Sequence, residues 1–285
     1  MQEIPSCPGI YIARCTSELN CWLLISNDMD IDMDTDSVWV NLVPGLEREL
    51  QVGDVCRSRT LQNKLSKDSD IQPIDEKHIA YLGRLIEECN AKEVFGIHLG
   101  HKHFDLREGT YLAGGLDTDD NRQYYWTRAV ENDGFDPSKL CGHIFIYDRE
   151  EGFGPSEFHQ GSLPDLSTVD RRLFPTFGRY LTKHMLEHNI ALEYLIPELR
   201  GRDMFELVLH EQQHILLCEP EIVLPSLGDS VVTAYSYVES GVAFGPGTRY
   251  ITPPGTNKHI TFNPDDLIEL KEVIDVFRKL EFLGI

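Results

Sequence analysis

The stretch Val94–Ala113, which reads VFGIHLGHKHFDLREGTYLA, combines a strong strand pattern with the densest group of polar functional side chains in the chain. Residues 94–104 and 110–113 have the composition of β-strands, and the polar segment 105–109 between them is typical of a turn. Residues 142–147 repeat the strand pattern. This part of the sequence therefore predicts neighbouring strands of one sheet.

The rest of the chain contains further short β-like segments and a few helical ones. The β-like segments are 10–25, where the sequence predicts a hairpin, and 37–42, 50–57, 205–209, 215–217 and 230–238. Apolar residues recur at helical spacing at about 75–90, 165–200 and 264–283. Asp75 and Asn263 are suitable N-caps for the first and the third of these helices.

Many short strands with helices grouped late in the chain argue against an alternating βαβ fold. The sequence therefore predicts the α+β class, with a mainly antiparallel β-barrel or sandwich to which helices are added. No linker rich in Gly and Ser and no internal repeat divides the chain. We expect a single domain over residues 1–285, with a helical insertion at about 163–203.

Composition and charge narrow the classes of function. With 41% hydrophobic and 26% charged residues, the chain falls in the range of globular proteins. A formal net charge of −21 disfavours nucleic acids and anionic membranes as partners. Residues 1–5 lack the basic start of a signal peptide, and the seven cysteines form no CxxC pair. We therefore expect a soluble cytoplasmic protein with reduced thiols and a small-molecule substrate.

A metal site is predicted in the opening stretch. His101 and His103 are two residues apart, so on a strand their side chains project from the same face and can bind one ion. Glu108, just past the predicted turn, completes a set of two His and one carboxylate, which suits non-haem iron with open positions. The alternative is that these imidazoles are hydrogen-bonded packing residues.

A second segment near the C-terminus makes the chain resemble the cupin superfamily. The residues that match the first cupin motif are His101, His103, Glu108 and Gly115. The residues that match the second motif are Gly247, Pro253, Gly255, His259 and Asn263. The resemblance implies a small β-barrel that holds a metal ion through His101, His103, Glu108 and His259.

Two strings of zinc-peptidase type also occur. The string at 210–214, HEQQH, would place His210 and His214 on one face of a helix, with Glu211 as the catalytic base. Because residues 205–209 alternate like a strand, the same two histidines also fit a strand end or a turn. The inverted string at 184–188, HMLEH, lies in a helical stretch, where a surface pair is the simpler interpretation.

These patterns favour a metal-dependent enzyme that uses iron, zinc, manganese or copper. We expect it to oxidise a small organic substrate, as a dioxygenase does, or to isomerise one, with Glu108 among the catalytic groups. His143, Glu157 and His159 could line the same cavity, although ordinary hydrogen-bonding roles are the simpler interpretation. The alternatives are a zinc-dependent hydrolase that uses Glu211, and a non-catalytic acidic binding or scaffold protein.

Overall fold

The computed structural model describes residues 10–13, 22–25, 42–67, 70–71, 73–119, 122–210, 213–218, 229–237 and 244–252. The helices in this part of the chain are α1 (Val52–Lys64), α2 (Glu76–Glu88) and α3 (Leu173–His184), with short 3-10 helices that include η4 (Pro197–Leu199). The strands are β1 (Ile10–Ala13), β2 (Trp22–Ile25), β3 (Phe95–Leu99), β4 (Thr110–Asp119), β5 (Arg122–Glu131), β6 (Leu140–Asp148), β7 (Gly152–Gln160), β8 (Ile190–Tyr194), β9 (Met204–Leu209), β10 (His214–Cys218), β11 (Asp229–Tyr237) and β12 (Phe244–Thr252).

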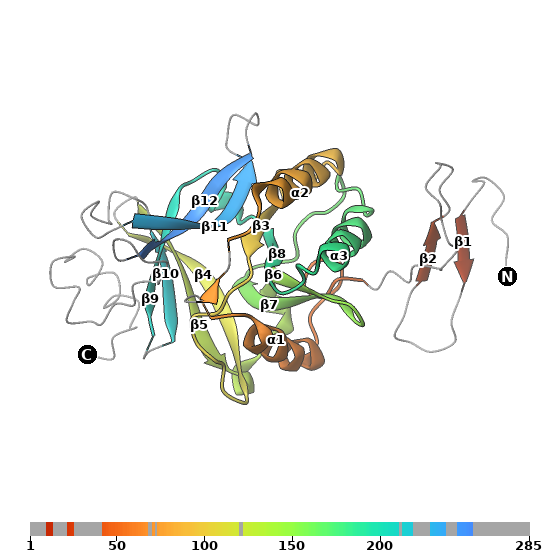
Figure 1. Cartoon of the computed structure of the whole chain (residues 1–285). Coiled ribbons are helices and arrows are strands. Elements are labelled where there is room, and N and C mark those ends of the chain that lie inside the picture. The colour runs from red at the N-terminus through yellow and green to blue at the C-terminus, as the bar shows by residue number, and fades with distance from the viewer. Residues whose placement is uncertain are drawn as a thin grey trace.

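Ten of these strands close into a barrel in the order β10-β5-β4-β7-β6-β8-β3-β11-β12-β9 (Figure 1). Pairs β4–β7 and β9–β12 are parallel, and the other barrel pairs are antiparallel. The sheet is therefore mixed, within the α+β barrel that the sequence predicts. The predicted hairpin at 10–25 is confirmed as the antiparallel pair β1–β2, in which Ile10 lies opposite Ile25.

The start of the helix predicted at Asp75 is confirmed, whereas the strand predicted at 50–57 is wrong. Helix α2 begins after Asp75, as predicted, because the Asp75 carboxylate accepts a hydrogen bond from the Lys77 backbone N–H. The strand predicted at 50–57 is instead the start of α1, where the Asp54 side chain accepts a hydrogen bond of 2.8 Å from the Gln51 backbone N–H. This capping box makes the apparent turn at 52–54 the first turn of a helix.

Among the described residues, the predicted helical stretch at about 165–200 is α-helical only over α3, and η4 adds one 3-10 turn at its end. The chain leaves α3 at Met185, whose φ of 56° is left-handed, and residues 190–194 form barrel strand β8 between β6 and β3. Apolar residues of a strand buried on one face and of a helix can share the same spacing, which explains the error. The helix predicted at 264–283 lies outside the described residues.

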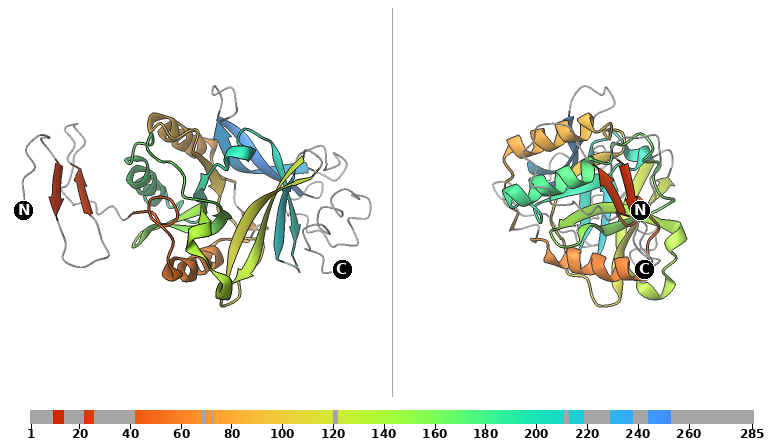
Figure 2. Two further views of the ribbon diagram at one scale, coloured as in Figure 1. Left: turned by 180° about the vertical axis from the view of Figure 1, so that it is seen from behind. Right: turned by 90° about the vertical axis from the view of Figure 1, so that its right-hand side faces the viewer.

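All three helices lie on one side of the barrel, away from β9 and β10 (Figure 2). Leu82 of α2 and Phe177 of α3 share an apolar cluster with Phe95 and Ile97 of β3. Successive side chains of a strand point to opposite faces, so the same packing turns His98 toward the barrel interior. No helix in the described part of the chain combines the length and the apolar character that a membrane crossing requires. On the side where the helices pack, the outer face of strand β3 is therefore apolar, and its inner face carries the polar side chain of His98.

Candidate metal centre

The three histidines of the opening stretch do not all lie on one strand. Strand β3 ends at Leu99, so the prediction of a strand through residue 104 is wrong beyond that point. Gly100 donates a backbone hydrogen bond of 2.8 Å to Asn189, and a Cβ atom at Gly100 would lie 2.6 Å from the His188 carbonyl oxygen. This close approach needs glycine, and it turns the chain out of the sheet just before His101.

The segment that follows is hydrogen-bonded to helix α1 and to a residue just after that helix. The Lys102 backbone N–H donates a 2.9 Å hydrogen bond to Ser66, and its ammonium contacts Asp105 at 2.7 Å. Asn63 of α1 accepts a 2.8 Å hydrogen bond from the Leu106 backbone N–H. These contacts hold the segment in place. The neighbouring His101 and His103 side chains are buried, with exposed fractions of 1% and 6%.

Glu206 of strand β9 is the carboxylate that meets these imidazoles. Its Oε2 lies 3.6 Å from His101 Nε2 and 3.4 Å from His103 Nε2, and its side chain is only 4% exposed. Its other oxygen, Oε1, accepts a 2.8 Å hydrogen bond from the hydroxyl of Thr233 on β11, a residue with 0% exposure. Thr233 thus fixes one carboxylate oxygen and leaves the other directed at the two histidines.

The protonation of His101 makes this contact chemically unusual. Its Nδ1 lies 2.7 Å from the Leu99 backbone carbonyl, which can only accept a hydrogen bond, so Nδ1 carries the proton. In a neutral imidazole Nε2 then carries a lone pair, which faces the Glu206 carboxylate. A distance of 3.6 Å exceeds the hydrogen-bond range of about 2.7 to 3.2 Å. In this neutral form two buried acceptors face each other across a gap, and either a proton on Nε2 or a metal cation between the two atoms removes the conflict.

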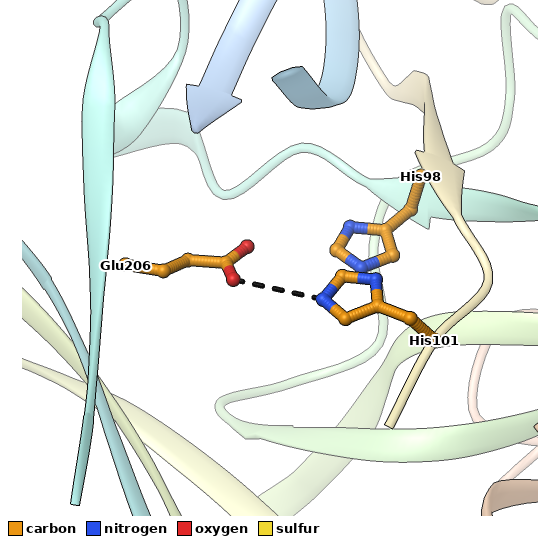
Figure 3. A group of neighbouring side chains, drawn as sticks. All are labelled: His98, His101 and Glu206. Carbon is orange, nitrogen blue, oxygen red and sulfur yellow. Dashed lines mark ion pairs between the residues drawn. The ribbon is translucent and has the colours of Figure 1, made fainter. Parts of the chain in front are cut away.

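His98 completes a group that matches metal ligation. The ligand atoms of His98, His101 and Glu206 all lie within 4.8 Å of one another, and Glu206 projects from β9 toward both rings (Figure 3). The His98 and His101 rings are nearly parallel, at 9°, with centroids 5.3 Å apart. Two atoms that each lie about 2.1 Å from one ion are about 3.4 Å apart at the tetrahedral angle. The separations of Glu206 from His101 and His103 approach this value.

A second polar group lies beside the first one. The two ring nitrogens of His143 on β6 face two carboxylates, with Nδ1 3.8 Å from Glu157 and Nε2 3.7 Å from Glu193. Glu193 also lies 3.8 Å from His98 Nδ1, which links the two groups. The Tyr125 hydroxyl is 3.1 Å from His143 Nδ1. Both groups line one cavity of about 430 Å³, part of which is open solvent.

The pKa values in this cavity reflect competition between burial and charge. Burial by itself raises the pKa of Glu206, but His101 and His103 outweigh it and hold that pKa well below its usual value. Burial lowers the pKa of His98, but hydrogen bonding and charge from Glu193 and other carboxylates raise it overall. Burial opposes ionisation of Glu157 as well, and His143 nevertheless lowers its pKa. The interior thus stabilises carboxylates in their charged form.

The other site residues predicted from sequence are outside this group or outside the described residues. Glu108 is exposed in the turn before β4, whereas His259 and Glu211 lie outside the described residues. His210 follows β9 and His214 begins β10, and these strands pair antiparallel, so the two histidines of the string lie at neighbouring strand ends. This confirms the strand-end interpretation of that string.

The inverted string at 184–188 is also broken, because α3 ends at His184. The Glu187 carboxylate accepts a hydrogen bond from Arg149, and the His184 ring contacts the ring of His78. The two histidines at its ends therefore do not share a helical face.

Sequence reasoning did not select His98, Glu193 or Glu206 as site residues. The available signal was a carboxylate that alternates with apolar residues inside a strand, as in Met204–Leu209 and Ile190–Tyr194. Burying a charge without a partner is costly, so such a residue indicates a partner on another strand. Of the three residues considered from sequence as possible neighbours of the first cluster, His143 and Glu157 line the same cavity as His101, and His159 is not among its lining residues.

Comparison of the chain with protein-family models, with curated protein sequences and with solved structures found no match.

Proposed function

We propose that this protein is a metal-dependent enzyme that binds one divalent transition metal ion inside its barrel and acts on a small organic substrate. The proposed ligands are His98, His101 and Glu206. The observation that carries the proposal is the buried contact between His101 Nε2 and Glu206 Oε2, neither of which has a hydrogen-bond partner among the described residues. A divalent cation between these atoms satisfies both of them at once.

The donor set indicates which metals and which chemistry to expect. Two imidazoles and one carboxylate suit iron, zinc, manganese or copper, and three protein ligands leave positions open for substrate or dioxygen. His103 also contacts Glu206 and is a candidate to orient that carboxylate or to join the ligands. The cupin resemblance adds His259 as a further candidate ligand. We propose oxidation or isomerisation as the reaction, with the metal as Lewis acid or oxygen site.

The group around His143 supports proton transfer beside the metal. Its imidazole lies between Glu157 and Glu193, and all three side chains line the same cavity as the proposed ligands. A positioned imidazole can give or take a proton during either reaction. We further propose that the protein works in the cytoplasm, which the free thiols of Cys56, Cys89, Cys141 and Cys218 support.

Elemental analysis of the natively purified full chain tests the metal centre. We expect about one metal ion per chain, and we expect Glu206→Gln to lower the occupancy at least tenfold. Glu108→Gln distinguishes the carboxylate predicted from sequence from the one in the structure, and Glu150→Gln, at an exposed position, is the charge-matched control. Metal-free wild type that cannot be loaded with zinc, cobalt or iron would refute the proposal, and loss of metal in Glu108→Gln alone would reassign the ligand.

A further inference from the structure

A second cavity lies next to the cavity at the proposed metal centre. It has a volume of about 450 Å³, including space open to solvent. Four side chains line both this cavity and the one at the metal centre: His143, Glu193, Leu217 and Thr248. The two cavities therefore share part of their walls at the His143 group, so a ligand in the second cavity lies against side chains that also line the cavity at the metal centre.

Part of the wall of this second cavity is formed by a tight turn that carries two arginines. The Arg202 backbone N–H donates a 3.1 Å hydrogen bond to the Leu199 carbonyl. Arg200 has φ −59° and ψ 130°, and Gly201 has φ 72°, which are the angles of a type II turn. Because the third position of this turn needs a left-handed φ, glycine there places Arg200 and Arg202 on either side of it, and both line the cavity.

The arginines place two guanidinium groups at the wall of this cavity, in a protein whose net charge is −21. Arg200 Nη1 contacts the exposed carboxylate of Glu93 at 3.3 Å, but its Nε is buried without a hydrogen-bond partner among the described residues. A buried guanidinium N–H without a partner is costly, so it favours an acceptor from a ligand. Guanidinium groups match the planar geometry of carboxylates.

Much of the remaining wall is apolar. Leu195, Ile196, Leu199 and Met204 line the cavity, together with the polar side chains of Ser236 and Thr248. A ligand that fits this arrangement has an anionic end, a short apolar body and a reactive end at the inner polar group. The inner carboxylates, Glu193 among them, disfavour the opposite orientation by repulsion.

We infer that the substrate of the proposed enzyme is a small organic acid, whose carboxylate binds Arg200 and Arg202 while its other end lies against His143 and Glu193, beside the proposed metal centre. The inference rests on the proposed function for the reaction, but binding of the acid is measurable without it.

Calorimetric titration of the full chain with hexanoate, hexanamide and inorganic phosphate tests the inference. We expect hexanoate to bind at least tenfold more tightly than hexanamide, and the double variant Arg200→Gln/Arg202→Gln to lose at least tenfold in hexanoate affinity. Arg179→Gln, an exposed position on α3, removes one positive charge elsewhere and serves as the control. It should bind hexanoate like the wild type.

Each titration is run on chelator-treated and on zinc-loaded protein, so that the two proposals can fail separately. Arginine-dependent binding of hexanoate in protein that takes up no metal leaves the organic acid in place and refutes the metal centre. Equal binding of acid and amide, no binding of hexanoate, or an equal loss in Arg179→Gln would overturn the inference. Binding of phosphate but not of hexanoate would overturn the assignment to a carboxylate.

Discussion

Replacing Thr233 by Val removes the hydroxyl that holds Glu206 and changes little else in shape. Thr233 has 0% exposure, and its Oγ1 donates a 2.8 Å hydrogen bond to Glu206 Oε1. Hydrogen bonds to charged groups contribute about 1.5 to 3 kcal/mol, and this one leaves a buried carboxylate oxygen without a donor when it is lost. We therefore expect Thr233→Val to lower the free energy of unfolding of metal-free protein by about 2 kcal/mol, and to weaken metal binding about 10- to 100-fold.

The chain offers a matched control for this substitution. Thr252 on the adjacent strand β12 also has 0% exposure, but its Oγ1 has no hydrogen-bond partner among the described residues. Thr252→Val should therefore leave the free energy of unfolding unchanged or raise it, since it removes an unpaired buried hydroxyl.

Urea unfolding of chelator-treated protein measures the first effect, and competition for zinc with a chromophoric chelator measures the second. The reasoning about Glu206 is refuted if Thr233→Val and Thr252→Val unfold at the same urea concentration and bind zinc with the same affinity. A loss of stability in Thr233→Val without any change in zinc affinity would keep the hydrogen bond and remove Glu206 from the ligand set.

Further predictions concern pH, backbone packing and thiol reactivity. Burial, with a smaller contribution from His143, lowers the pKa of His159 to about 4. The unfolded chain therefore binds more protons than the folded one between about pH 6.5 and 4. The free energy of unfolding should fall by up to about 3 kcal/mol as the pH drops through that window. His159→Gln should flatten this dependence in urea titrations made at several pH values, and an unchanged slope would contradict the assignment. Gly100→Ala should destabilise the fold by about 1 to 3 kcal/mol and weaken zinc binding, because its Cβ would meet the His188 carbonyl at 2.6 Å; a variant that matches the wild type in both measurements would show that the segment before His101 adapts. Among the four described cysteines Cys56 is exposed, whereas burial raises the pKa of Cys141 to about 11, so mass spectrometry after brief alkylation should find Cys56 modified well before Cys141.

Local patterns in the sequence determine several elements of this fold. The cap at Asp75 and the apolar spacing after it specify α2, and β-favouring segments specify the pair β1–β2 and strands such as β6 and β11. The same patterns failed at 50–57, where a capping box starts α1, and at 190–194, where apolar spacing is shared by helix and strand. In both places the deciding contacts are made by partners that a periodicity count does not include.

The sequence also drew attention to His101 and His103, whose rings lie 4.7 Å apart in the structure. The identity of the carboxylate that meets them was decided by barrel closure. Glu108 is near in sequence but exposed, whereas Glu206 is distant in sequence, and strand β9 brings it across the interior to both rings. Spacing along a chain fixes only which side chains share a face of one element. Strand order in the closed sheet fixes which faces meet, and the free energy of burying charges selects pairs that satisfy one another there.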